Sequence, residues 1–527
     1  MRRRRYNPCS ITIFLYLRFF PRMKAYYAIL YTSTAIITLL ARCASPTTPP
    51  VKPNIIVFYV DDLGYSDVGC YGARGVTTPN IDSLARQGIR FTDAHCGAAT
   101  CTPSRYSLLT GRYAFRNKAA ILPGDAPLLI DTAQHTLPGM LRNAGYTTAI
   151  VGKWHLGLGI GHIDWNHHIT PGANEVGFDY SFLLPATGDR VPTVYVEDGD
   201  VVNLDATDPL RVSYHERFED AEVAYTDSLK MNADLQHSNT IVNGVPRIGF
   251  MKGGRRAHWV DEDFPHLFNE KALAFIDGAK DKPFFLFYSF HDIHVPRLPH
   301  ADFIGKSTLG PRGDAIAQVD WVVGQIVAAL KQKGLADNTL IIFTSDNGPV
   351  LDDGYADEAV ERMGDHTPGG PFRGGKYSAY EAGTRVPTIV WWPAHVKPKV
   401  SEALLTQVDL LASLTALVHA PAVHNIDSQD QLNAWLGQDP TGHKTIIEES
   451  FTLSLREGHW KYIQPFIGTT PTWMENKKIE HGLSRVGQLY DLQRDPGEKQ
   501  NLAEKLPEQA GRMQRTLDAV VAGQKIQ

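Results

Sequence analysis

The fold is decided by the stretch NIIVFYVDD, residues 54–62. An apolar run rich in β-branched and aromatic residues ends directly at two aspartates, Asp61 and Asp62. A continuous apolar run of this length predicts a strand that is buried on both faces, as in a parallel sheet. Three further runs end at polar residues in the same way: 147–151 before 152–155, 283–290 before 291–294, and 339–344 before 345–348.

Helical patterns lie between these runs, at residues 81–88, 137–145 and 316–334, and a further one spans residues 408–419. Strands that alternate with helices predict an α/β fold with a mostly parallel central sheet flanked by helices. Near the C-terminus, strand-like runs within residues 445–463 precede a helical pattern at 502–522. This order predicts a small antiparallel sheet with one packed helix.

The chain length of 527 residues favours one large domain and one smaller domain. The N-terminus has the pattern of a targeting segment, because basic residues precede an uncharged run at 25–41. Met23 is an alternative start, and Cys43 stands where a bacterial lipoprotein would carry its lipid, although Arg42 departs from that pattern. We therefore expect an exported protein that is periplasmic, a cell-surface lipoprotein or secreted. The predicted divisions are a leader at 1–44, a Pro-rich linker at 45–53, a large domain at 54–425 and a C-terminal subdomain at 426–527.

Composition narrows the class of protein. Apolar residues make up 43%, charged residues 21%, and the formal net charge is −5, so no nucleic-acid partner is expected. Of the five cysteines, Cys70, Cys96 and Cys101 lie beyond the leader, too few for a disulfide framework. A pairing of Cys70 with Cys96 stays open at this point. No Cys/His ligand pattern typical of structural zinc is present.

The polar strand ends are expected to meet, because open α/β sheets bind ligands at the carboxyl ends of their strands. Their oxygen donors suit Ca²⁺ or Mg²⁺ and not zinc. Of the two ions we expect Ca²⁺. Cys101 precedes a helix that starts with Pro103, so it is placed at a helix N-terminus, which favours anions. Candidate residues are Asp61, Asp62, Asp346 and Asn347 for the cation, Arg105, Lys153 and Lys376 for an anion, and His155 and His294 for protons. This set is typical of a site for a tetrahedral oxyanion ester, either phosphate or sulfate.

The motif CTPSR at 101–105, followed by LTGR at 109–112, resembles the signature of type I, formylglycine-dependent sulfatases of the alkaline-phosphatase-like superfamily. The resemblance covers nearly the whole chain after the leader. It includes DDLG at 61–64, GKWHLG at 152–157, SDNG at 345–348, residues 375–387, and LYDL at 489–492. It implies that the large domain is a sulfatase catalytic domain of the alkaline-phosphatase-like fold.

The resemblance also implies roles for these residues. A maturation enzyme that reads Pro103 and Arg105 would oxidise Cys101 to formylglycine, whose hydrate attacks sulfur. Modified Cys101 would complete the cation shell formed by Asp61, Asp62, Asp346 and Asn347. Arg105 would position these groups, and Lys153 and Lys376 would bind sulfate oxygens. His155 would accept a proton during sulfate release, and His294 would protonate the leaving oxygen, with His291 as a weaker candidate.

The substrate prediction rests on two blocks, 187–192 and 291–297, which resemble the subgroup of galactosamine-6-sulfatase-like enzymes. They imply removal of a 6-O-sulfate from galactose or N-acetylgalactosamine in a sulfated polysaccharide or glycosaminoglycan. Asp189 and Arg190 suit a pair of sugar hydroxyls, but an internal ion pair explains them equally well. Thr187, Arg297 and His300 are further candidates for the sugar site, and Trp259 is assigned to the core.

Three alternatives stay open. The enzyme could act at another sulfate position, or it could hydrolyse phosphate or phosphonate monoesters with the same fold. A surface glycan-binding lipoprotein without catalysis is the third, and it would be expected to lack some of these ligands.

Overall fold

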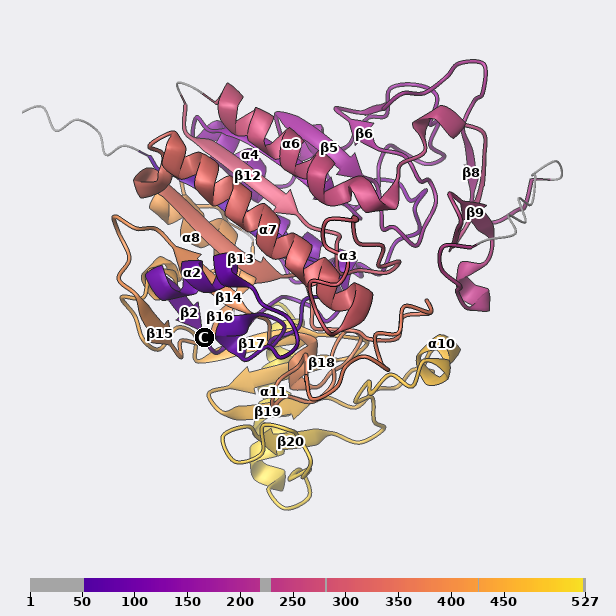
Figure 1. Ribbon diagram of the computed structural model, residues 1–527. Coiled ribbons are helices and arrows are strands. Elements are labelled where there is room, and N and C mark those ends of the chain that lie inside the picture. Colours follow the sequence, from indigo (N-terminus) through magenta and orange to yellow (C-terminus); the bar gives the residue numbers. More distant parts are fainter. Residues whose placement is uncertain (1–51, 219–228, 280–281, 425, 525–527) are drawn as a thin grey trace, which may run out of the picture. The chain divides into compact units, whose positions relative to one another are not determined.

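The structure, a computed structural model, describes residues 52–218, 229–279, 282–424 and 426–524, and the leader predicted at 1–44 lies outside them. A ten-stranded sheet, with the strand order β15-β2-β14-β13-β1-β12-β4-β5-β6-β7, forms the centre of the large domain (Figure 1). Its strands are β1 (Asn54–Val60), β2 (Ile89–Phe91), β4 (Thr147–Lys153), β5 (Tyr180–Leu184), β6 (Val196–Glu197), β7 (Asp200–Val201), β12 (Phe284–Ser289), β13 (Thr339–Ser345), β14 (Thr388–Trp391) and β15 (Lys399–Ser401).

The five central strands, β13, β1, β12, β4 and β5, run parallel to one another. Antiparallel pairs occur only toward the two sides of the sheet among the described residues, at β13–β14–β2 and β5–β6–β7. The prediction of a mostly parallel sheet is thus confirmed. Because parallel strands end at the same edge, the polar segments that follow them lie together.

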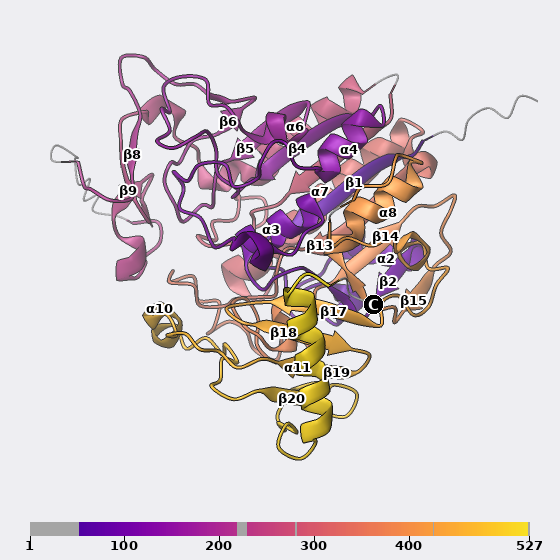
Figure 2. The same ribbon diagram turned by 180° about the vertical axis from the view of Figure 1, so that it is seen from behind.

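Both faces of the sheet are covered by helices, as the apolar strands require. Side chains alternate along β1, so that Ile55, Val57 and Tyr59 enter one core and Ile56, Phe58 and Val60 enter the other. The helices α2 (Pro79–Gln87), α6 (Phe264–Gly278) and α7 (Gly310–Gln332) cover one face (Figure 1). The opposite face carries α3 (Cys101–Thr110), α4 (Leu137–Asn143), α5 (Ala173–Val176), α8 (Leu410–Leu417) and α9 (Leu432–Trp435) (Figure 2).

The predicted small sheet is also present. The strands β17 (Thr445–Glu449), β18 (Leu453–Glu457), β19 (Trp460–Ile463) and β20 (Gln488–Asp491) are antiparallel. Helix α11 (Pro507–Val521) packs on this sheet, with Met513 and Leu517 against Ile447 and Leu455. A short helix, α10 (Thr472–Asn476), lies between β19 and β20. Residues 53–527 form one unit, and the boundary at 425–426 stays a prediction.

The described part of the stretch 191–258 supplies β6 and β7 of the central sheet and two short ribbons, β8 (Arg211–Ser213) with β11 (Phe250–Lys252) and β9 (Thr240–Val242) with β10 (Val245–Arg247). A further pair joins β3 (Ala94–His95) to β16 (Leu405–Thr406).

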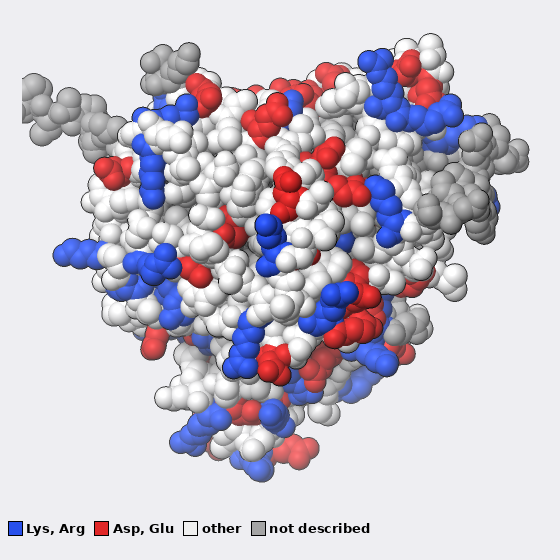
Figure 3. Space-filling model, in the orientation of Figure 1, with Lys and Arg blue, Asp and Glu red and all other residues white. Residues whose placement is uncertain are grey.

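The described cysteines, Cys70, Cys96 and Cys101, are free thiols. Cys70 and Cys96 therefore do not form the disulfide that the sequence left open. Within the described ranges, no helix has the length and apolar character needed to cross a membrane. Acidic and basic side chains are interspersed over the face shown in Figure 3.

Candidate active site

The centre of the site is a group of buried oxygen donors at the carboxyl edge of the sheet. Asp61 and Asp62 follow β1, while Asp346 and Asn347 follow its neighbour β13, whose register pairs Val60 with Ser345. One carboxylate oxygen from each of the three aspartates lies within 4.8 Å of the others. Asp61 Oδ1 and Asn347 Oδ1 are buried and have no hydrogen-bond partner among the described residues.

Buried oxygen atoms without a hydrogen-bond partner are rare in folded proteins, and these two belong to a cluster of oxygen atoms that could ligate a cation. Burial, together with the negative charge of Asp61, raises the pKa of Asp346 to about 7, because the clustered carboxylates repel one another. A hard divalent cation would satisfy the free oxygens and relieve this repulsion. The donor set therefore fits Ca²⁺ or Mg²⁺.

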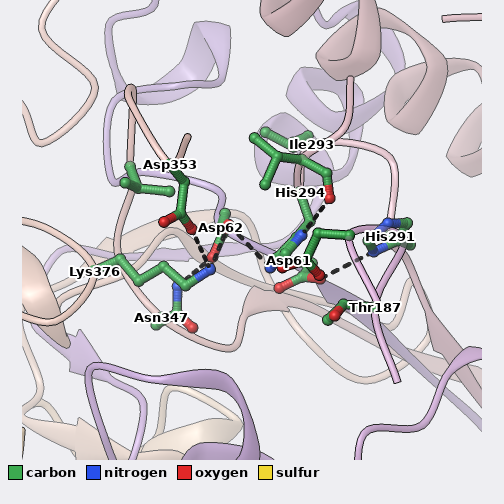
Figure 4. A network of polar contacts seen from close by, with 12 residues as sticks. Asp61, Asp62, Thr187, His291, Ile293, His294, Asn347, Asp353 and Lys376 are labelled. Carbon is green, nitrogen blue, oxygen red and sulfur yellow. Dashed lines mark hydrogen bonds and ion pairs between the residues drawn. The ribbon is translucent and has the colours of Figure 1, made fainter. Parts of the chain in front are cut away.

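Three buried cationic side chains surround the carboxylates. Lys153 Nζ donates to Asp61 Oδ2 at 2.6 Å. Lys376 Nζ donates to Asp62 Oδ2 at 2.8 Å, as Figure 4 shows. Arg105 donates from two nitrogens to Asp346 Oδ2, at 2.9 and 2.7 Å. Each aspartate thus has its own cationic partner. Such a concentration of positive charge can also bind an anion that enters the site.

Cys101 is the first residue of α3 and is 2% exposed. Its Sγ, an Asp61 carboxylate oxygen and a His294 ring nitrogen all lie within 4.8 Å of one another. Arg105 follows four residues later and therefore lies on the same face of the helix. Burial raises the pKa of the Cys101 thiol to about 11, so an unmodified thiol would be neutral and weakly nucleophilic at physiological pH.

His294 and His155 are neutral bases in this environment. The Nδ1–H of His294 donates to the carbonyl of Val295 at 2.7 Å, which leaves Nε2 free at 3.9 Å from Asp62 Oδ2. His155 donates from Nε2 to the carbonyl of Leu122 at 3.0 Å, and its buried Nδ1 has no hydrogen-bond partner in the part of the chain that the structure describes. Burial, then Lys376 for His294 and Lys153 for His155, holds the pKa of each imidazole well below its usual range.

His291 also contacts the cluster. Its Nε2 accepts a hydrogen bond from the Gly188 amide at 3.0 Å, so Nδ1 carries the proton and points to Asp61 Oδ2 at 3.3 Å (Figure 4). Burial lowers the pKa of His291. This side chain orients the Asp61 carboxylate.

Comparison with known proteins identifies the family. A family model described as Sulfatase matches residues 53–420. The chain belongs to the sulfatase family. This sulfatase is a sulfuric ester hydrolase, and this activity excludes the alternative of a glycan-binding lipoprotein without catalysis.

Its relatives include carbohydrate and aryl sulfatases. It is 50% identical over 477 residues to an N-acetylgalactosamine-6-O-sulfatase of Bacteroides thetaiotaomicron, covering 89% of this chain and 93% of that protein. Human arylsulfatase A is 30% identical over 491 residues, covering 88% of this chain and 86% of that protein.

Solved structures share the fold. One, from work on the metabolism of multiple glycosaminoglycans by B. thetaiotaomicron, has a TM-score of 0.87 at 50% identity and covers 89% of this chain and 99% of its own. A phosphonate monoester hydrolase of Agrobacterium radiobacter has the same fold, with a TM-score of 0.56 at 18% identity, covering 89% and 96%.

The residues predicted to bind the sugar differ in their contacts and exposure. Arg190 Nη1 donates to Thr187 Oγ1 at 2.7 Å and to both Asp189 oxygens at 2.8 Å, so the ion pair expected as the alternative is present. Arg190 keeps 16% of its side chain exposed, which leaves an edge for a ligand. Trp259 belongs to the core, with 2% exposure.

Arg297 and His300 do not join the site. Arg297 is fully buried and donates to the Ile293, Val350 and Leu351 carbonyls and to Asp357, so direct sugar contact does not fit its geometry. His300 lies instead with His266 and Asp302. The local sequence does not predict the partners that come from distant segments, namely Val350, Leu351 and Asp357 for Arg297 and His266 for His300.

Sequence reasoning missed Asp353, His237 and Lys477. Asp353 bridges Lys376 at 3.4 Å and Lys477 at 3.1 Å, and His237 Nε2 lies 3.5 Å from Asp189 Oδ2. Lys477, Trp473 and Asp234 line a cavity of about 1050 Å³ beside this bridge. Asp353 stands in a polar loop shortly after Asn347, whereas no local motif marks Lys477 or His237.

Proposed function

We propose that this sulfatase removes the 6-O-sulfate of galactose or N-acetylgalactosamine in a sulfated polysaccharide or glycosaminoglycan. The nucleophile would be formylglycine made from Cys101. The observation that carries the proposal is the approach of Cys101 Sγ to Asp61 and His294 within 4.8 Å, inside a ring of buried cations. The 50% identity to an N-acetylgalactosamine-6-O-sulfatase supports the choice of sugar and position.

The reaction follows from the side chains at hand. One hydroxyl of the hydrated formylglycine attacks sulfur and passes its proton to the Asp346 carboxylate, and the bond between sulfur and the sugar oxygen breaks. His294, which is protonated on Nε2 when the anionic sulfate is bound, gives that proton to the leaving oxygen. Lys153 and Lys376 hold the sulfate oxygens while charge shifts between them. His155 Nδ1, free and neutral, then accepts the proton of the second hydroxyl as the aldehyde re-forms and sulfate departs.

A divalent cation held by Asp61, Asp62, Asp346 and Asn347 would acidify the attacking hydroxyl and stabilise negative charge on the sulfate. We propose Ca²⁺, with Mg²⁺ as the alternative. Chelation should abolish turnover. Calcium should restore it more fully than magnesium, and the reverse order would overturn the choice of ion.

The experiment for the reaction is peptide mass spectrometry across Cys101 combined with a substrate screen. We expect an aldehyde in place of the thiol, and sulfate release from 6-sulfated galactose and N-acetylgalactosamine. Cys101→Ala should be inactive. Release from only 4- or 2-sulfated sugars would overturn the substrate but keep the class, and faster turnover of aryl phosphate than of aryl sulfate would overturn the class of ester.

A maturation enzyme is a proposed partner. Because Cys101 and Arg105 are buried, with exposures of 2% and 1%, it would act before folding is complete. Folded chain made without the enzyme should therefore resist later conversion.

Export, with a lipid on Cys43, is proposed from the leader alone. Cell fractionation of the full chain and of Cys43→Ala tests it. Loss of membrane association in the variant supports an anchor, and identical fractionation excludes one.

A further inference from the structure

A cluster outside the catalytic pocket joins His266, in the first turn of α6, to His300 and Asp302, in the segment after β12. Their side chains are 38%, 27% and 62% exposed. We propose that this cluster is a second metal site, which binds a transition-metal ion such as Zn²⁺ through two imidazoles and one carboxylate.

The spacing of the three ligand atoms fits this ion. His266 Nε2 lies 3.2 Å from His300 Nδ1 and 3.0 Å from Asp302 Oδ2, and the last two atoms are 3.3 Å apart. Bonds of about 2.0–2.2 Å in a tetrahedral zinc site separate neighbouring ligand atoms by roughly 3.3–3.5 Å. Zinc therefore requires an outward movement of only a few tenths of an ångström.

The ligand types separate this site from the catalytic one. Two imidazole nitrogens and one oxygen suit zinc, whereas the catalytic cluster offers oxygen donors that suit calcium. The partial exposure of all three side chains leaves the fourth position open to water. Without metal, His266 Nε2–H is shared between Asp302 and His300, and the Asp302 amide donates to His300 Nδ1 at 3.2 Å. Zinc would replace that ring proton and displace the amide.

The surroundings hold the ligands in place. The His266 ring packs edge-on against Trp321 of α7, with centroids 4.8 Å apart, and Phe303 packs against the same indole. The His300 amide donates to Gln318 Oε1 at 2.6 Å. Ligands fixed in this way lose little freedom when an ion binds.

The bound ion would tie α6 to the segment that follows β12. It has no contact with the carboxylates of the catalytic cluster, so we expect it to act on stability and not on turnover. Gln318 also donates to Asp292 at 3.0 Å, and it thereby links this segment to the loop that carries His291.

The test uses the mature chain saturated with calcium and titrated with Zn²⁺ by calorimetry, and with Co²⁺ by visible absorption. We expect one zinc equivalent, a tetrahedral Co²⁺ spectrum, and a higher melting temperature with zinc. His266→Ala and Asp302→Asn should each weaken zinc binding at least tenfold, yet keep the zinc-free melting temperature and sulfate release. Asp302→Asn is the milder variant should His266→Ala fail to fold.

Two controls separate this site from others. His167→Ala removes an exposed histidine that pairs with Asp164 at 2.7 Å, and it should bind zinc as the wild type does. Asp62→Asn should also keep the zinc site. The proposal is wrong if the wild type binds no zinc, or if His266→Ala and Asp302→Asn bind it as tightly as His167→Ala does.

Discussion

At the scale of single residues, the site depends on charges that are paired out of water. Asp61, Asp62 and Asp346 are each buried beside a cationic side chain, while Asp61 Oδ1 and Asn347 Oδ1 have no hydrogen-bond partner among the described residues and are available to a cation. A buried charge that keeps its partner is tolerated, but removal of the partner leaves an uncompensated charge. This explains why the same side chains serve both stability and chemistry.

We expect Asp189 to hold Arg190 where it contacts the sugar hydroxyls, and His237 to position Asp189. A hydrogen bond to a charged group contributes about 1.5–3 kcal/mol, or roughly 10–150-fold in kcat/KM. Asp189→Asn should therefore lower kcat/KM for the sulfated sugar by that factor, and His237→Gln by about tenfold at the low end. Aryl sulfate, which has no sugar hydroxyls, should be hydrolysed almost normally. Equal losses on both substrates would show that these residues serve the chemistry instead.

Glu449 should make stability depend on pH. Its Oε2 accepts the Phe115 amide at 2.8 Å, and burial raises its pKa to about 8. The folded chain keeps this proton up to that pH, while the unfolded chain loses it near 4.5. The free energy of unfolding should therefore fall between these values, by about 2–4 kcal/mol, and then level off.

Urea unfolding at pH 5 and pH 8 checks this expectation. Glu449→Gln should lose that part of the pH dependence. Glu457→Gln, a change in the same sheet at a partly exposed residue whose carboxylate pairs with Arg512, should keep it. Identical slopes in wild type and Glu449→Gln would contradict the assignment.

At the scale of elements, the ends of the strands position the side chains of the active site. β4 ends at Gly152-Lys153, and Gly152 lies directly against the neighbouring strand β12. An added Cβ there would meet the Ser289 carbonyl oxygen at 1.9 Å, and φ is +109°. Glycine lets β4 approach β12 closely and delivers Lys153 to Asp61.

Gly152→Ala should lower the free energy of unfolding by about 3 kcal/mol or more, because strain and overlap add. Gly145→Ala is the matched control, since Gly145 has φ of +93° with open space around its Cβ position, and it should cost about 1–2 kcal/mol from the backbone alone. Denaturant unfolding measures both. Equal costs would show that β4 and β12 can move apart at this point.

At the scale of the whole molecule, a network of buried charges connects the small C-terminal sheet to the segment that follows Lys376 of the active site. Lys461 of β19 is fully buried, 2.8 Å from Glu448 and 3.2 Å from Glu381, which lies in the segment after Lys376. Glu498, from the segment after β20, accepts the Glu381 amide at 2.6 Å. The segment from the LYDL motif at 489–492 to Glu498 therefore has a structural role.

Lys461→Met should destabilise the chain by about 3–5 kcal/mol, because two buried carboxylates, Glu381 and Glu448, each lose a cationic partner. The double variant Lys461→Met/Glu448→Gln should recover part of this loss, since Glu448 then carries no buried charge, whereas Glu381 still pairs with Arg456. Thermal and urea unfolding of both variants provide the measurement. Additive losses in the double variant would mean that the two side chains do not interact.

The chain by itself determined much of this protein. Periodicity predicted β1, β4, β12 and β13 to within two residues, because strands buried on both faces must be apolar throughout. It placed the start of α7 six residues too late, at 316 instead of Gly310, since the polar first turn with its proline hides the apolar period. The residues of the carboxyl edge were predictable because they follow directly after those strands.

Only the tertiary structure decided the partners of side chains that lack a local pattern. Asp353 and Lys477 are 124 residues apart, and His237, which lies in a short helical turn before β9, meets Asp189. Arg297 and His300, which resemble sugar ligands in the sequence, are engaged by carbonyls, Asp357, His266 and Asp302 instead. The chemical properties of a side chain follow from its residue type. Its partners depend on which distant segments pack beside it, and the local periodicity of the sequence does not contain that information.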